Sequence, residues 1–500
     1  MPKPAPILLP LLSALLLSAC ATGPDYRAPV SALPDAWPTH SALSAAQDGA
    51  PPAPEDESAP VTDSTHWSDW WHRFGDPELD RLVALAQAGN SDIRLQLARI
   101  EAARAQLGLA RAEQMPSIGV QAEAARARQS GEVLGLGERT SPVGSYSLAG
   151  LLGYEIDLWG RLANERAAAE ALLNESRYAR DAIRLAVVSD VVSTYFNLRA
   201  AERQLDITER TLAAREAAFR LEQIRFEGGE TDELVLSQSR SELATIRAQI
   251  PQRIERVRTL ESALAVLIGL SPAELFSTAS VAPGWLEDID QPQGVPTVLP
   301  SELLLRRPDL RASEATLHAA AASVEVARTA RLPRINLSML LGAGALQIDN
   351  LFSSSAETWS IGGALTAPLF DFGRNRARVD AATAQLRQTE IRHDAIVRSA
   401  FVEVRDALTL VDTRAARVEA TREQVSALAH TQKLAELRYR EGLIGMVELL
   451  DAQRALLNAE LAHTEAISQR LTATAGLFKA LGGGWNESDA FENARLPASS

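Results

Sequence analysis

The feature that most constrains this chain is an internal repeat. Two long stretches of it match one another at an offset of roughly 213 to 217 residues. Glycine, proline and arginine keep step throughout: Asp92-Ile93-Arg94 with Asp309-Leu310-Arg311, Pro116 with Pro333, Gly160-Arg161 with Gly373-Arg374, Gly229 with Gly442, and Gly269 with Gly482. A period of that size is far too long for a solenoid. The sequence therefore predicts a tandem duplication.

The repeat sets the expected domain boundaries. Each copy reads as a helix, two strands, a very long helix and a return helix. The first copy covers 76–270, with strands near 117–128 and 145–156 and long helices over 160–227 and 231–269. The second copy covers 301–485, with strands near 334–345 and 357–369 and long helices over 373–440 and 445–481. A lipidated strap, 20–75, precedes the copies, a connector, 271–300, joins them, and a tail, 486–500, ends the chain.

The helical segments carry a seven-residue apolar period. Residues 160–227 contain no internal Pro or Gly, and a helix of this length would extend about 100 Å. A sustained seven-residue period produces a left-handed supercoil. In the first copy one column runs Val191, Leu198, Leu205, Leu212, Phe219 and Phe226, and the return helix repeats the spacing with Pro251 inside it. The matching column of the last helix contains His463 and Arg470, so we expect it to be more polar and more accessible to water.

The segments between the helices alternate with strand period. In the first strand, apolar residues from Ile118 to Ala124 alternate with Gly119, Gln121 and Glu123. Strands of about ten residues are long enough to cross a bilayer when tilted. A half-buried sheet in a soluble domain would give the same alternation, so a single strand does not decide between the two.

Counting the strands favours an assembly. Four strands cannot close a transmembrane cylinder, which needs at least about eight, and an open edge is not tolerated in lipid. Two copies would give a narrow barrel filled by side chains, whereas three would give twelve strands and a lumen. The long helices favour the larger assembly, because a filled barrel has no evident use for them.

The N-terminus predicts export. Residues 1–19 have Lys3, a short apolar stretch and a small-residue end, as in a signal peptide. Cys20, the only cysteine, follows directly and matches the lipidated position of a bacterial lipobox. Ala21 comes next, where an aspartate would resemble an inner-membrane retention signal. We therefore expect a lipoprotein of the outer membrane; the lipid would anchor the chain without spanning.

Several functional classes find no support in the sequence. The net charge of −14 gives no global attraction to nucleic acid. A single cysteine excludes a multi-cysteine metal cluster, and the seven histidines never occur at ligand spacing. No nucleophile elbow, His-Glu-x-x-His or phosphate-binding glycine loop is present. The sequence thus predicts a protein that is not an enzyme and that uses neither a metal nor a cofactor.

A set of motifs resembles a known family. They are Gly23-Pro24-Asp25-Tyr26, Trp70-Trp71-His72-Arg73-Phe74, the segment from Tyr154 to Arg161, the segment from Phe370 to Asn375, Leu449 to Arg454, and Ala480 to Trp485. In this order they resemble the NodT-type lipoprotein branch of the TolC outer-membrane factors. The resemblance implies an α+β membrane protein: a homotrimer with a twelve-stranded transmembrane β-barrel, four strands per chain, continued by a twelve-helix α-barrel in the periplasm.

The same resemblance implies a function. Such proteins are passive exit ducts of tripartite pumps that export drugs or other small toxic compounds. The implied partners are a periplasmic adaptor (membrane fusion) protein, an inner-membrane transporter of the resistance-nodulation-division type and outer-membrane lipid. An outer-membrane duct for type I protein secretion is the main alternative, followed by a structural coiled-coil lipoprotein of the periplasm. An adaptor should instead carry lipoyl-like segments, and a lipoprotein enzyme should show a convergent site.

The resemblance also points to a gate. The turns at Gly228-Gly229 and Gly442 end the two long helices, and by resemblance they form the periplasmic mouth. Glu448 and Asp451, one helical turn apart, match acidic positions that constrict this mouth, and Tyr439 matches a residue of the closing network. Acids in a first helical turn can also simply stabilise the helix through its dipole, whose positive end lies there. The first copy has Val235 where the second has Glu448, so only one copy should supply the acidic rings.

Overall fold

The structure, a computed structural model, describes residues 69–128, 130, 141–275, 281, 284–290, 292 and 306–483. The predicted signal peptide, the lipidation site Cys20 and the C-terminal tail lie outside these residues. The described chain divides into two compact units. The first contains residues 99–176 and 312–394, and the second contains the remainder.

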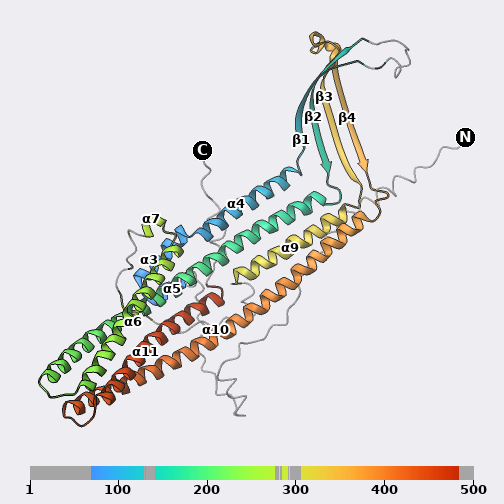
Figure 1. The fold of residues 1–500 in the computed structure, drawn as a ribbon. Coiled ribbons are helices and arrows are strands. Elements are labelled where there is room, and N and C mark those ends of the chain that lie inside the picture. The colour runs from blue at the N-terminus through green and yellow to red at the C-terminus, as the bar shows by residue number, and fades with distance from the viewer. Residues whose placement is uncertain are drawn as a thin grey trace, which may run out of the picture. The chain divides into compact units, whose positions relative to one another are not determined.

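From α4 in the first copy and α9 in the second, the two copies contain the same order of elements (Figure 1). The first copy consists of α3 (Pro77–Gly89), α4 (Ser91–Ala112), β1 (Ser117–Ala127), β2 (Val143–Ile156), α5 (Arg161–Glu227) and α6 (Glu233–Leu267). The second consists of α9 (Pro308–Thr329), β3 (Arg334–Ala345), β4 (Glu357–Thr366), α10 (Arg374–Arg440) and α11 (Met446–Ala480). Short helices are η2 (Trp70–Phe74), α7 (Pro272–Leu275), η3 (Leu286–Asp288), η4 (Ile348–Asn350) and η5 (Ser354–Ala356). Strand β4 ends at Thr366, before the expected residue 369. Pro368 has no N–H to donate to a neighbouring strand.

The four strands form one antiparallel sheet in the first unit, in the order β1-β2-β3-β4. The register places Ile118 opposite Leu152, Leu152 opposite Met339, and Met339 opposite Ile361. Because directly opposed residues share a face, the alternation of each strand adds up across the sheet. One face is apolar from edge to edge, and the other carries Gln121, Ser147, Ser338 and Ser360 among small residues and the central pair Leu151 and Leu340.

The apolar face and both edges are open in the single chain. Ile118 is 80% exposed, Val120 78% and Ile361 71%. Strands β1 and β4 are each paired on one side only. A soluble sheet would cover such a face with helices, whereas a face turned toward lipid is left apolar. Among the described helices, none has a run of apolar residues long enough to cross a bilayer.

Aromatic side chains build the core of the second unit. Trp70 stacks on Phe478 with ring centroids 5.3 Å apart, and Phe74 packs edge-on against Phe196 at 4.9 Å. The Trp-Trp-His-Arg-Phe motif therefore supplies core residues. Nearby, the carboxylate of Asp76 caps α3 by accepting from the N–H groups of Glu78 and Leu79.

The seven-residue column is buried along only part of its length. Val191, Leu198 and Val404 are completely buried, but Phe226, at the end of the α5 column, is 39% exposed. The expectation of a continuous apolar stripe was right for the middle of these helices. Toward the hairpin ends of α5 and α10 the chain lacks enough neighbours of its own to bury the stripe.

The ends of α6 and α11 pack closely on the chain entering α4 and α9. Gly269 has φ +77°, and a Cβ there would lie 2.2 Å from the carbonyl oxygen of Gly89. Its counterpart Gly482 has φ +91°, with the Arg306 carbonyl oxygen 3.2 Å from such a Cβ. Only glycine suits this conformation and approach, which explains why the repeat keeps both residues.

Candidate functional site

The candidate site lies in the second unit, where two helical hairpins turn. Helix α5 ends in a Schellman motif: the N–H of Glu230 bonds to the Arg225 carbonyl at 2.8 Å, and that of Gly229 to Phe226 at 3.0 Å. Helix α10 ends in the same way, with Leu443 bonded to Arg438 at 2.8 Å and Gly442 to Tyr439 at 3.0 Å. Gly229 and Gly442 take φ +76° and +68°. The predicted turn glycines therefore terminate both helices by one mechanism.

Tyr439 links the two hairpins. Its hydroxyl donates to Oε1 of Glu222 on α5 at 3.2 Å, and Arg225 holds the same oxygen at 3.1 Å. The Glu222 side chain is 3% exposed, and its second oxygen has no hydrogen-bond partner in the described chain. Burial, followed by the Glu222 charge, raises the pKa of Tyr439. The tyrosine therefore remains a protonated donor at any pH below about 10.

Glu448 and Asp451 lie on the exposed side of the first turns of α11, where the neighbouring Met446, Leu449 and Leu450 are buried. Asp451 is 64% exposed and accepts from Nη1 of Arg454 at 3.1 Å. Both acids thus face away from the chain's own core. The Tyr439 ring packs against the buried residues of the same turn, so the structure brings all three predicted gate residues to one end of one hairpin.

A second polar link joins α11 to α6. Nε of Arg454 donates to Glu242 at 2.9 Å, and the Glu242 side chain is 7% exposed. The adjacent Arg215 is 6% exposed, its Nε has no partner in the described chain, and burial lowers its pKa. Arg215 lines a cavity of about 260 Å³, and Glu436 and Gln453 line the same cavity. Arg454 therefore joins an exposed acid to a buried one.

Sequence reasoning did not identify Glu222, Glu242 or Arg215 as part of this site. The partners of the two acids lie more than 200 positions away in the chain: Tyr439 and Glu222 are separated by 217 residues, and Arg454 and Glu242 by 212. Only the local pairs left a signal, because an arginine three residues from an acid faces it on a helix. Arg225 with Glu222 and Arg454 with Asp451 have that spacing.

Comparisons with known proteins decide the family. The family described as "Outer membrane efflux protein" matches residues 82–270 and 299–483. The chain belongs to this family. Outer membrane protein OprJ of Pseudomonas aeruginosa is 34% identical over 490 residues, which cover 97% of this chain and 98% of OprJ. The cation efflux system protein CusC of Escherichia coli is 28% identical over 96% of this chain and 99% of its own length. The CmeC outer membrane channel of Campylobacter jejuni superposes with a TM-score of 0.84 at 26% identity, covering 95% of this chain and 98% of CmeC.

These matches confirm the resemblance to TolC-type outer-membrane factors. The fold of four strands and long helices per chain agrees with the solved channels, and the family's match in two segments agrees with the duplication. The chain is an outer-membrane channel protein of an efflux system and extends into the periplasm. It is a transport protein and not an enzyme.

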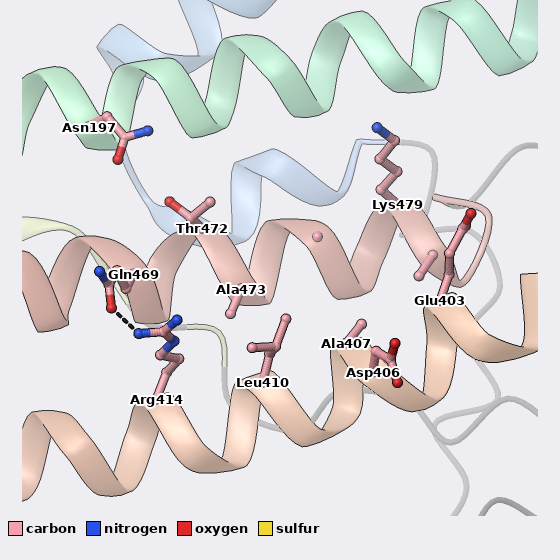
Figure 2. A pocket seen from close by; sticks show the side chains of 12 residues that line it. Asn197, Glu403, Asp406, Ala407, Leu410, Arg414, Gln469, Thr472, Ala473 and Lys479 are labelled. Atoms are coloured by element: carbon pink, nitrogen blue, oxygen red, sulfur yellow. Dashed lines mark hydrogen bonds between the residues drawn. The ribbon is translucent and has the colours of Figure 1, made fainter. Parts of the chain in front are cut away.

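A larger cavity, also in the second unit, has charged groups of both signs along its walls. It has a volume of about 570 Å³ and is lined by α10, α11 and Asn197 of α5 (Figure 2). Glu403 and Asp406 lie at one end with Lys479, and Arg414, bonded to Gln469, lies at the other. The wall between them is largely aliphatic. No group of acids and histidines in the described chain could hold a metal ion.

Proposed function

We propose that three copies of this chain form the outer-membrane exit duct of a tripartite efflux pump. One observation carries this proposal: the four-stranded sheet has an apolar face, a polar face and two open edges. A lipid-facing sheet must close on itself, because backbone groups at an open edge have no partner in lipid. Three copies supply twelve strands, enough for a water-filled lumen lined by the polar face.

The helical hairpins would then form the periplasmic mouth. Three-fold symmetry places Glu448 and Asp451 in rings of three carboxylates each, on the side that the chain leaves exposed. Such rings favour cations and constrict the opening. The Tyr439–Glu222 hydrogen bond would latch one hairpin to the other in the closed state, with Arg225 holding the carboxylate in place.

The partners in this proposal are a periplasmic adaptor and an inner-membrane transporter of the resistance-nodulation-division type. Relatives are named for antibiotic efflux and for toluene efflux in Pseudomonas putida. We therefore propose small toxic molecules as cargo, with the transporter supplying the energy. Lipidation at Cys20 would anchor the N-terminus to the outer membrane.

Crosslinking in cells tests the assembly. Purification of the crosslinked protein should recover an adaptor and a transporter together with the trimer, and deletion of the gene should increase sensitivity to the transporter's substrates. Recovery of an ATP-driven transporter with a protein substrate would instead support the type I secretion alternative.

Replacement of the lipidated residue tests a separate part. Cys20→Ser should weaken targeting to the outer membrane and still allow trimers to form, because the barrel inserts by its own apolar face. Accumulation of this variant only as a soluble monomer would show that insertion depends on the lipid.

A further inference from the structure

An aromatic cluster stands exposed in the first unit, where the chain leaves β4 and enters α10. Leu369 is 96% exposed, Phe370 81% and Phe372 93%. The two phenylalanine rings lie edge to face with centroids 4.8 Å apart. Single exposed apolar residues are ordinary on a protein surface, but three within four positions indicate a surface that another molecule covers.

The backbone holds this cluster in a defined conformation. The Asp371 carboxylate accepts from the N–H of Gly373 at 3.0 Å and from that of Asn375 at 2.9 Å. Phe372 has φ +53°, and it is the only non-glycine residue with positive φ among those described. Bulky residues seldom adopt this region. The phenylalanine side chain is therefore presented by the turn and is not a loose part of it.

The first copy of the repeat shows what covers the equivalent position. The offset that aligns Gly160 with Gly373 aligns Trp159 with Phe372. Trp159 is partly buried, and its Nε1 donates to the carbonyl of Pro333, just before β3, at 2.7 Å. Pro333 in turn corresponds to Pro116, just before β1. Within the chain, the aromatic residue that follows β2 is thus hydrogen-bonded to the residue just before the next strand, β3.

We propose that Phe372 and its neighbours bind the Pro116 end of β1 in a second copy of this chain, repeating between chains the contact that Trp159 makes within one. The inference rests on the proposed trimer and deepens it by assigning the seam. Met115, beside Pro116, is 66% exposed and would be covered by the cluster. The Phe372 side chain has no N–H group like that of Trp159, so this seam is held by apolar packing where the internal one has a hydrogen bond.

The same transfer fixes the strand register of the seam. Within the chain, Leu151 lies opposite Leu340. Shifting each by its own offset places Ala364 of β4 opposite Glu123 of β1 in the second copy. Ala364 and Glu123 both belong to the polar face of the sheet. The transferred register therefore keeps the two faces separate, as it must, because a slip of one residue would interchange them.

Disulfide mapping in isolated outer membranes tests the register. Ala364→Cys with Glu123→Cys should give covalent dimers and trimers on oxidation. Leu151→Cys with Leu340→Cys, the equivalent pair within one chain, should form a disulfide without linking one chain to another. The slipped pair Ala364→Cys with Gln121→Cys should give about ten-fold less covalent oligomer, because diagonal neighbours are about 7–8 Å apart. Each single-cysteine chain serves as a background control. Efficient crosslinking of the slipped pair, or none of the first pair while the internal bond forms, would overturn the register.

A matched pair of substitutions tests the cluster. Phe372→Ala should lower, by several degrees, the temperature at which the detergent-solubilised trimer dissociates, and Phe372→Trp should preserve it. Phe352→Ala removes an equally large ring that is 82% exposed between β3 and β4, and it should change nothing. Equal effects of Phe372→Ala and Phe352→Ala would refute the seam. A wild-type protein that is monomeric and does not conduct would instead refute the proposed duct itself.

Discussion

The two helical hairpins share a backbone and differ in their polar side chains. At the α5–α6 turn and at the α10–α11 turn, the same two hydrogen bonds close the helix around a left-handed glycine. Yet Glu448 corresponds to Val235, and Tyr439 to Phe226. Helix α6 is capped by the Asp232 side chain, whereas the N-cap of α11 is Gly445, which has none. Glycine positions set the shape of both hairpins, and the residues between them set what each can do.

The difference also explains why the polar links run between the copies. Glu222 corresponds to Ala435, and Arg454 to Ser241. A latch within one copy would need both partners in that copy, and neither copy has them. Tyr439 with Glu222, and Arg454 with Glu242, each join one residue of the first copy to one of the second. The duplication thus supplied two hairpins that could specialise as the two sides of one contact.

Substitution of a glycine that both copies share should have the largest effect. Gly269→Ala should destabilise the protein by about 3 kcal/mol, because a Cβ would overlap the Gly89 carbonyl and φ is positive. Gly482→Ala should cost about 1 kcal/mol, since its nearest neighbour is farther away. Thermal unfolding followed by circular dichroism in detergent would measure both. Equal losses would mean that the two ends are not packed differently.

The next effect concerns the latch. Tyr439→Phe leaves the buried Glu222 with only Arg225 and should cost the closed state about 1.5 kcal/mol, a roughly ten-fold shift toward opening. Single-channel recording would detect the change as a higher open probability. Phe226→Leu, at the corresponding place in the first copy, is the control and should leave gating unchanged. A Tyr439→Phe channel with wild-type gating would remove the latch from the account.

The acidic rings should produce a smaller change. Glu448→Ala together with Asp451→Ala should raise single-channel conductance roughly two-fold and lower cation preference in planar bilayers, because fixed negative charge leaves the mouth. Gln238→Ala, at the first-copy position that corresponds to Asp451, should do neither. Unchanged conductance in the double variant would exclude both acids from the gate.

The smallest effect depends on pH. His463 of α11 corresponds to Ile250 of α6, and its Nδ1 lies 2.9 Å from the Thr421 hydroxyl. Burial lowers the pKa of His463, with Glu287 opposing and Arg422 adding to the shift. Because the unfolded ring gains a proton below about pH 6.5 and the folded ring resists it, stability should fall as pH drops below that value.

His463→Ile should flatten this dependence between pH 7.5 and 5.5. The change in melting temperature should be small, since the side chain is only partly buried. Burial also lowers the pKa of His393, so this residue should leave part of the dependence of stability on pH. A full wild-type slope in the His463→Ile variant would assign the pH dependence elsewhere.

The sequence was sufficient wherever the signal was local or repeated. Pro116 and Pro333 separate helix from strand, Gly229 and Gly442 end the long helices, and the alternation from Ile118 onward assigns the apolar face. The pairing of β2 with β3 was not predictable, because the paired residues Ile156 and Ile335 lie far apart in the chain and many registers preserve the alternation. The structure supplied that register.

The site was predictable only in part for a similar reason. The resemblance predicted Glu448, Asp451 and Tyr439 as gate residues, and the i, i+3 spacing of Asp451 and Arg454 was visible in the sequence. Glu222 and Glu242 were not distinguishable from the many surface acids of an acidic chain. Their burial depends on which helix packs against which, and that is a property of the assembled hairpins.

In the proposed assembly, one chain holds a third of a closed channel. Native mass spectrometry of the detergent-extracted protein, combined with conductance of the same sample in planar bilayers, measures both the number of chains and the open pore. We expect a mass three times that of one mature chain and discrete ion-conducting steps. A single species of one chain's mass that stays dispersed without detergent and leaves bilayers impermeable would contradict it.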